Sequence, residues 1–242
     1  MYFKRKIYDQ LLEWKGASKG KSAILIEGAR RVGKSTIAEE FARNEYDDYI
    51  LLDFAMESKD IRQNFEDNIG DLDAFFRNLF IIKGKDLSGK KAVIIFDEVQ
   101  LFPEARQAIK YLVADGRYDY IETGSLISIK KNVKDILIPS EEEKLKMYPM
   151  DFEEFLWAKG NTAAMPAIKA AFESRKPLGE AVHRKLMQLF REYIAVGGMP
   201  QAVASYVDGD SYAEIDRIKQ GIISLYEDDL KKYDDEEHGK AS

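Results

Sequence analysis

Residues 28–35 read Gly-Ala-Arg-Arg-Val-Gly-Lys-Ser, and this stretch decides the fold class. It matches the pattern G-x-x-x-x-G-K-[ST] at every specified position. The apolar run of residues 23–27 precedes it, and residues 34–44 after it have the pattern of a helix. Glycines let consecutive backbone N–H groups curl around a phosphate, and the start of the following helix faces the same phosphate. The stretch therefore predicts a strand, a phosphate-binding loop and a helix in that order.

The residue types of this loop predict their roles toward a nucleotide and its metal ion. Lys34 is expected to place a cation on the β- and γ-phosphates and to act in catalysis. Ser35 is expected to supply a hydroxyl ligand to Mg²⁺, and Thr36 to reach the α-phosphate. A nucleoside triphosphate with Mg²⁺ is thus predicted, and ATP is favoured as the cofactor because the sequence has no separate Asn-Lys-x-Asp guanine motif. The predicted nucleotide-binding residues are Gly28, Ala29, Arg30, Arg31, Val32, Gly33, Lys34, Ser35 and Thr36.

Two adjacent carboxylates follow a second apolar run, residues 92–96, and form the next signal. The carboxyl end of a buried parallel strand lies at the ligand crevice of an α/β sheet. Asp97 is therefore predicted to join Ser35 in holding Mg²⁺, directly or through water. Glu98 points elsewhere because strand neighbours alternate, and it is predicted to activate the attacking water as a general base.

A polar strand end at residues 123–125 is a weaker signal. The strand predicted at 118–122 ends in Thr-Gly-Ser, and a hydroxyl there could orient water or sense the γ-phosphate. Thr, Gly and Ser are also common wherever a strand meets a turn, so both interpretations stay open. Ser125 is the predicted catalytic sensor, with Thr123 as the other candidate.

Continuous apolar runs separated by helical segments predict an α/β fold, with a parallel sheet covered on both faces. A further run lies at 49–54, and helical spacing begins again after Pro103. From residue 152 to 225 the helical period dominates. The expected domains are an N-terminal helix and linker (1–20), a P-loop ATPase domain (21–150), a smaller helical domain (151–226), and an exposed tail or the start of a further domain (227–242).

Composition excludes several classes of site. The chain has 242 residues, no Cys and only two His, which excludes disulfides and argues against a zinc site. The net charge of −6 does not indicate a nucleic-acid footprint over the whole chain. No apolar run is long enough to cross a bilayer and no secretory signal is visible, so a cytoplasmic protein without membrane contact is expected.

The N-terminal region is locally basic, and its meaning stays open. Lys4, Arg5 and Lys6, with the lysines at 15, 19 and 21, are interleaved with aromatic residues. A nucleic-acid patch is conceivable, but the pattern favours a solvated face beside a packing helix. Phe152, Phe155 and Leu156 share one helical face, which favours core packing.

With these motifs, the chain resembles a bacterial and archaeal family of AAA-type ATPases that join a P-loop domain to a helical domain. The resemblance rests on residues 28–36, 95–100 and 123–125, and above all on two later signatures, residues 148–156 and Gly-Gly-Met-Pro at 197–200. It implies the strand order 5-1-4-3-2 and a nuclease-like domain following the helical one. Members often carry a Gly-Arg pair before the 148–156 signature. Residues 138–144 contain no Arg, so no arginine role carries over there.

These observations predict an ATPase that couples nucleotide state to movement of the helical domain. A transition-state arginine from a neighbour in a homo-oligomer is expected. The sequence does not choose among Arg77, Arg106, Arg117, Arg184 and Arg191. Two alternatives remain. One is a nucleotide-dependent binding switch with little hydrolysis. The other is a nucleic-acid-handling ATPase that acts through a further C-terminal domain.

Overall fold

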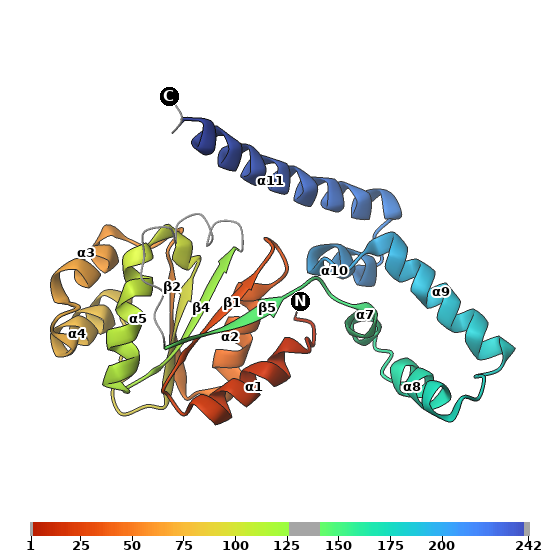
Figure 1. The fold of residues 1–242 in the computed structure, drawn as a ribbon, viewed down its shortest axis with the longest axis horizontal. Helices are drawn as coiled ribbons and strands as arrows, with labels where there is room; N and C mark the ends of the chain where they lie inside the picture. The colour runs from red at the N-terminus through yellow and green to blue at the C-terminus, as the bar shows by residue number, and fades with distance from the viewer. Residues whose placement is uncertain (1, 126–140, 240–242) are drawn as a thin grey trace. The chain divides into compact units, whose positions relative to one another are not determined.

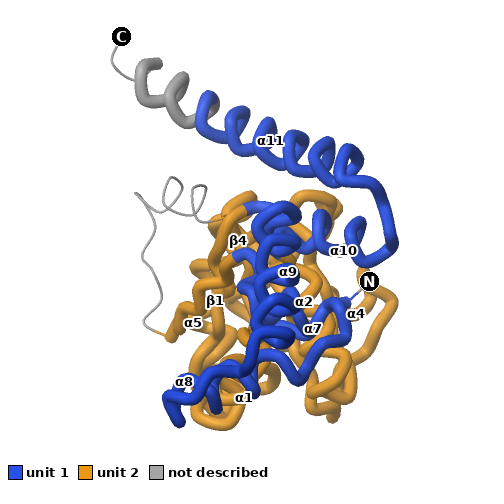
Figure 2. The backbone as a smooth tube through the Cα atoms, turned by 90° about the vertical axis from the view of Figure 1, so that its right-hand side faces the viewer, with its two compact units in different colours: residues 1–5, 30–32, 149–242 blue, residues 6–29, 33–148 orange. Residues whose placement is uncertain are grey.

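The structure, a computed structural model, describes residues 2–125 and 141–239, with side chains described through residue 231. The chain forms two compact units (Figure 2). The first, orange in Figure 2, comprises residues 6–29 and 33–148, and the second, blue in Figure 2, comprises residues 1–5, 30–32 and 149–242.

The first unit is built on a parallel sheet of five strands (Figure 1). The strands are β1 (Ala23–Gly28), β2 (Asp48–Asp53), β3 (Ala92–Asp97), β4 (Asp119–Ser125) and β5 (Glu142–Met147). Their order across the sheet is β2-β3-β4-β1-β5, and every pair is parallel. The α/β fold of a P-loop NTPase and the expected strand order are both confirmed.

Helices cover both faces of this sheet. Figure 1 shows α1 and α2 on one face and α3, α4 and α5 on the other. Because both faces are covered, β1 and β3 are buried along their whole length, as their continuous apolar runs require. The helical segments of the first unit are α1 (Ile7–Ser18), α2 (Lys34–Glu45), α3 (Lys59–Asn68), α4 (Leu72–Lys83), the short 3₁₀ helix η1 (Val99–Leu101) and α5 (Pro103–Asp115).

Two boundaries differ from the sequence prediction. Helix α1 continues to Ser18, through residues expected to be a linker, because the Ser18 hydroxyl accepts a hydrogen bond from the Ser22 backbone N–H (2.9 Å) and Lys19 ends the helix in the left-handed region. Strand β4 includes residues 123–125, which were expected to follow it. They stay in the strand because Thr123, Gly124 and Ser125 pair in register with β1.

The second unit contains five helices in the part of the chain that the structure describes. Its core is a cluster of apolar side chains around Met150, Phe155, Val196, Val203 and Ile215. Phe155 and Leu156 are fully buried, which confirms the apolar face predicted for this segment. The helices are α7 (Phe152–Ala158), α8 (Ala164–Ser174), α9 (Glu180–Val196), α10 (Pro200–Asp208) and α11 (Tyr212–Gly239).

The segment from residue 227, expected to be an exposed tail or the start of a further domain, belongs to helix α11, which continues to Gly239. Its composition gives nothing to bury but does favour helix, since Glu, Lys and Leu are good helix formers. Lys231 and Asp228, three residues apart, lie 3.9 Å from each other on the helix surface. Low hydrophobicity in this segment is therefore compatible with a regular helix.

The Gly-Gly-Met-Pro break places Gly198 against the backbone of Met150. The Met150 N–H donates to the Gly198 carbonyl (2.7 Å), and the Tyr193 hydroxyl donates to the Met150 carbonyl (3.0 Å). A Cβ atom at residue 198 would lie 2.1 Å from the Met150 carbonyl oxygen. Only glycine allows this approach, which joins the start of the second unit to the turn between α9 and α10.

Replacing Gly198 by Ala should therefore destabilise the second unit, because backbone and not a flexible side chain would have to move. The expected loss in the free energy of unfolding is about 1–3 kcal/mol, the usual range for overpacking. Urea unfolding followed by circular dichroism measures it. The matched control is Gly221→Ala in α11, where no atom lies within 4 Å of an added Cβ. That change should stabilise by about 0.5–1 kcal/mol, and a similar loss in both variants would contradict this account of Gly198.

Candidate nucleotide site

The loop between β1 and α2 folds around the side chain of Lys34. Its Nζ donates to the carbonyls of Gly28 (3.1 Å) and Ala29 (3.0 Å), and the residue is only 5% exposed. Gly33 has φ +97° and caps α2, whose first turn closes when the Ile37 N–H donates to the Gly33 carbonyl (3.0 Å). The sequence pattern thus yields a cation at the start of a helix, where an anion is favoured.

The middle of this loop, residues 30–32, groups with the second unit. Within that unit, the buried Arg5 donates to the Val32 carbonyl (2.9 Å) and lies 3.2 Å from the Glu154 carboxylate. Arg30 pairs with Asp229 at 2.9 Å. Both predicted loop arginines are exposed, and Arg31 has a left-handed backbone (φ +66°).

Asp97 connects the loop to two neighbouring strands. At the end of β3, its Oδ1 accepts a hydrogen bond from the Ser35 hydroxyl (2.8 Å) and another from the Thr123 hydroxyl of β4. Asp97 is itself largely buried. The structure therefore brings together Ser35 and Asp97, the two residues predicted to hold a metal ion.

Glu98 follows in a left-handed conformation, with φ +53° and ψ +44°, which is uncommon for a residue with a side chain. Its backbone N–H donates to the Thr123 hydroxyl (3.3 Å). Its carboxylate accepts a hydrogen bond from the side-chain amide of Gln100, in η1. Backbone strain of this kind concentrates at functional sites, where surrounding contacts hold it in place.

Two contacts add to the sequence prediction. Of the two candidate sensors, the Thr123 hydroxyl contacts Asp97, whereas Ser125 lies at the buried end of β4 in register with Gly28. The second contact is that of Gln100 with Glu98. Its place two residues after Glu98 was the available signal, but only the 3₁₀ turn brings the two side chains together. Thr36 is exposed on the first turn of α2.

A family model described as an AAA domain matches residues 20–156, which is more than half of the chain. The chain belongs to this AAA domain family. Membership places it among the nucleotide-binding ATPases of the AAA type. A second model, a domain of unknown function, matches residues 187–241.

Other comparisons add less. Curated proteins give no match to the sequence. Among solved structures, the chain is similar to C. elegans PCH-2, with 12% identity and a TM-score of 0.34. That similarity covers 69% of this chain and 46% of the PCH-2 chain, so the match spans less than half of that structure.

The oxygen donors of this AAA domain fit Mg²⁺. Mg²⁺ is typically held by one or two protein oxygens together with phosphate oxygens and water, and Ser35 and Asp97 supply a hydroxyl and a carboxylate 2.8 Å apart. Among the described residues there is no cluster of three or more acidic or histidine side chains that could hold a metal without such help. The described helices also include none long and apolar enough to cross a membrane.

Burial excludes one of the candidates for the transition-state arginine. Arg106, in α5, is 3% exposed and makes two hydrogen bonds of 2.8 Å to the Glu142 carboxylate. Next to this pair, burial and the charge of Glu142 raise the pKa of Glu122 well above its ordinary value, which favours a neutral carboxyl. Because an arginine that serves a neighbouring subunit must be exposed, Arg106 is a structural residue.

Proposed function

We propose that this AAA domain binds ATP with Mg²⁺ and hydrolyses it to ADP and phosphate. The observation that carries the proposal is the 2.8 Å hydrogen bond from the Ser35 hydroxyl to Asp97, which joins the phosphate loop to the end of β3. Metal ligands on the loop and at the end of β3, and a base directly after that strand, are the parts that phosphoryl transfer to water requires.

Each residue has a distinct role in this proposal. Lys34 neutralises charge on the phosphates, and residues 28–36 surround them with backbone N–H groups. Bound Mg²⁺ would neutralise charge on the β- and γ-phosphates. Ser35 and Asp97 would hold that ion, Thr123 orients Asp97, and Glu98 accepts a proton from the attacking water. An arginine from a second copy of the chain stabilises the transition state. The helical unit moves when the nucleotide state changes.

The experiment is phosphate release from Mg·ATP, measured at several protein concentrations. Hydrolysis supports the proposal, and turnover per molecule that rises with concentration supports an arginine supplied by a neighbour. Tight ATP binding without any turnover would contradict it and would leave a nucleotide-dependent binding switch.

Gln100 provides a further test, because its amide fixes the Glu98 carboxylate. Gln100→Leu removes the donor while keeping a side chain of similar size. We expect kcat to fall about tenfold, as for a hydrogen bond to a charged group, with little change in the Kd for ATP. If Gln100 acts through Glu98, the same change in a Glu98→Gln background costs nothing further, whereas an equal loss in both backgrounds would show a purely structural role.

A further inference from the structure

Two adjoining cavities lie at the edge of the sheet opposite the phosphate loop. Their volumes are about 800 Å³ and about 470 Å³, and both are lined by Arg117 and Tyr118, which precede β4. The second cavity also includes Lys91, directly before β3, and Lys19, shortly before β1. This is the amino edge of the sheet. Since the strands are about six residues long, it lies about 20 Å from the edge that carries the loop.

Cations from several segments gather at this edge. Seven basic and three acidic side chains line the two cavities, and three further acids, Glu45, Asp48 and Asp115, pair with four of these bases, which leaves an excess of one positive charge. These cations come from segments far apart in sequence: the end of α1, helix α4, the loop from 84 to 91, and the turn before β4. The fold therefore brings together cations that lie far apart in the sequence.

Four of the seven cations are held by acids. Lys85 and Lys90 both pair with Asp48, at 2.5 Å and 2.8 Å. Arg117 pairs with Asp115 at 2.7 Å, and the less exposed Lys15 lies 3.5 Å from Glu45. These pairs fix the walls of the cavities and leave little charge to attract a ligand.

The other three cations, Lys19, Arg77 and Lys91, are named here the amino-edge cations. All three are exposed, and within residues 2–125 and 141–231 none of them makes an ion pair. Burial and the nearby charge of Lys91 lower the pKa of Lys15, although Glu45 and Asp119 oppose this. Lys91 therefore lies near a second cation, an arrangement that a bound anion would stabilise.

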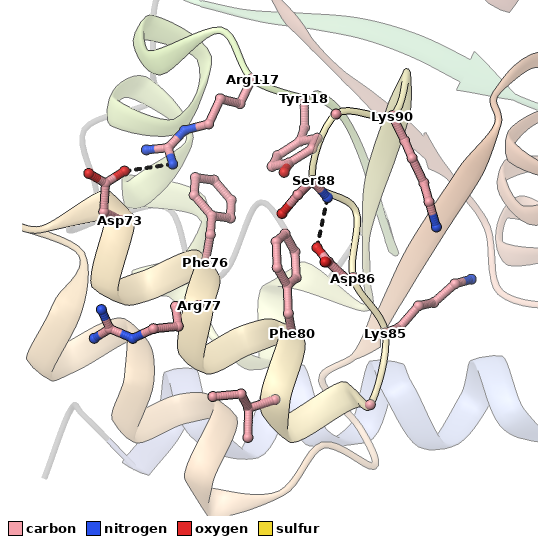
Figure 3. A pocket seen from close by; sticks show the side chains of 13 residues that line it. Asp73, Phe76, Arg77, Phe80, Lys85, Asp86, Ser88, Lys90, Arg117 and Tyr118 are labelled. Atoms are coloured by element: carbon pink, nitrogen blue, oxygen red, sulfur yellow. Dashed lines mark hydrogen bonds and ion pairs between the residues drawn. The ribbon is translucent and has the colours of Figure 1, made fainter.

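The walls between these cations are aromatic and backbone surfaces. Figure 3 shows Phe76, Phe80 and Tyr118 side by side, and the Arg117 guanidinium lies 4.7 Å from the Phe76 ring. Gly89 and Gly116, at φ +71° and +73°, have no atom within 4 Å of where a Cβ would stand. A ligand can therefore approach the main chain of both turns directly.

We propose that the amino-edge surface binds the sugar–phosphate backbone of a nucleic acid. Cations spread over several segments suit a linear polyanion, which presents a charge at each phosphate. A membrane surface is flat and is met by projecting groups, whereas these cations border cavities. The proposal is independent of ATP hydrolysis, and it assigns nucleic-acid contact to the ATPase unit itself instead of to a further domain.

Fluorescence anisotropy with labelled single-stranded DNA, single-stranded RNA and duplex DNA tests this, using the whole chain over a series of salt concentrations. The test variant carries Lys19→Glu, Arg77→Glu and Lys91→Glu, which break no ion pair among the described residues. We expect its affinity at low salt to fall at least about tenfold. On duplex, the slope of log K against log salt should shrink by about 0.9 for each phosphate that the variant no longer neutralises. The three probes distinguish single strand from duplex.

The control variant carries Lys110→Glu, Lys169→Glu and Lys176→Glu, three exposed lysines elsewhere with the same change of net charge. It should bind as wild type does. Equal losses in both variants would reduce the effect to net charge and overturn the proposal, as would absence of binding by the wild type at low salt. Binding only to phosphatidylserine vesicles or to an acidic polypeptide, abolished in the test variant, would also overturn it by identifying another partner. Circular dichroism of each variant checks that it is folded.

Discussion

Lys34→Ala is expected to abolish ATP binding at ordinary nucleotide concentrations. Lys34 is almost fully buried and already donates to the carbonyls of Gly28 and Ala29, so it both shapes the loop and aims a cation at the phosphate position. Its loss removes charge-assisted hydrogen bonds worth about 1.5–3 kcal/mol each. We expect the Kd for ATP to rise by more than about tenfold. We also expect kcat to fall about a hundredfold to a thousandfold, as when an electrostatic donor to the transition state is removed.

Isothermal titration calorimetry with Mg·ATP and a phosphate-release assay measure the two effects separately. Lys110→Ala is the matched control, because it removes an exposed lysine from α5 of the same unit and should change neither quantity. Lys34→Ala that binds ATP as tightly as the wild type would show that nucleotide is held elsewhere. The phosphate-loop interpretation would then fail even if the fold is intact.

The sequence predicts those parts of this site whose chemistry requires residues that are adjacent in the chain. A phosphate loop must be continuous in the chain, so the motif alone predicts residues 28–36. The buried strand before Asp97 predicts the position of that carboxylate. The identity of the polar residue that meets Asp97 was not readable in the same way. Thr123 and Ser125 both end β4, and which hydroxyl reaches the carboxylate depends on register and on the extent of the strand.

Elements held by pairing and not by burial were harder to predict. Strand β5 has the sequence Glu-Glu-Lys-Leu-Lys-Met, and it is at the edge of the sheet, where one face and one side lack the cover that a central strand has. Its six register pairs with β1 hold it in place without an apolar run. Hydrophobicity therefore could not identify this strand in the sequence. The same holds for Gly198, since the need for glycine arises from Met150, 48 residues earlier, and from nothing local.

The amino-edge cations show that a charged surface is equally hard to predict from the sequence. The sequence of the basic N-terminal segment favours a solvated face beside a packing helix. Parallel strands bring the residues that precede β1, β3 and β4 to one edge. Lys19 therefore lines one cavity with Lys91 and Arg117 only after folding. Charge counted along the chain underestimates charge counted over a surface that several segments share.

Glu98→Gln is expected to separate binding from chemistry. The change keeps the shape of the side chain and removes the carboxylate that would accept a proton from water, which is worth about a hundredfold to ten-thousandfold in rate. The left-handed backbone at residue 98, the hydrogen bond from its N–H to Thr123, and the Asp97 contacts do not depend on that charge. We therefore expect kcat to fall by at least about a hundredfold while the Kd for Mg·ATP stays within about threefold of wild type.

Glu98→Gln and Lys34→Ala should fail at different steps, the first at hydrolysis and the second at ATP binding. Glu98→Gln should accumulate bound ATP, detectable as nucleotide that remains unhydrolysed after rapid gel filtration, whereas Lys34→Ala should retain none. Thr123→Val adds a discriminating case, since it removes the hydroxyl shared by Asp97 and the Glu98 N–H and should weaken metal-dependent binding and turnover together. If Glu98→Gln hydrolyses ATP at the wild-type rate, the base is another group. The strained backbone at residue 98 would then require an explanation other than catalysis, because its cost is retained only where surrounding contacts are selected to hold it.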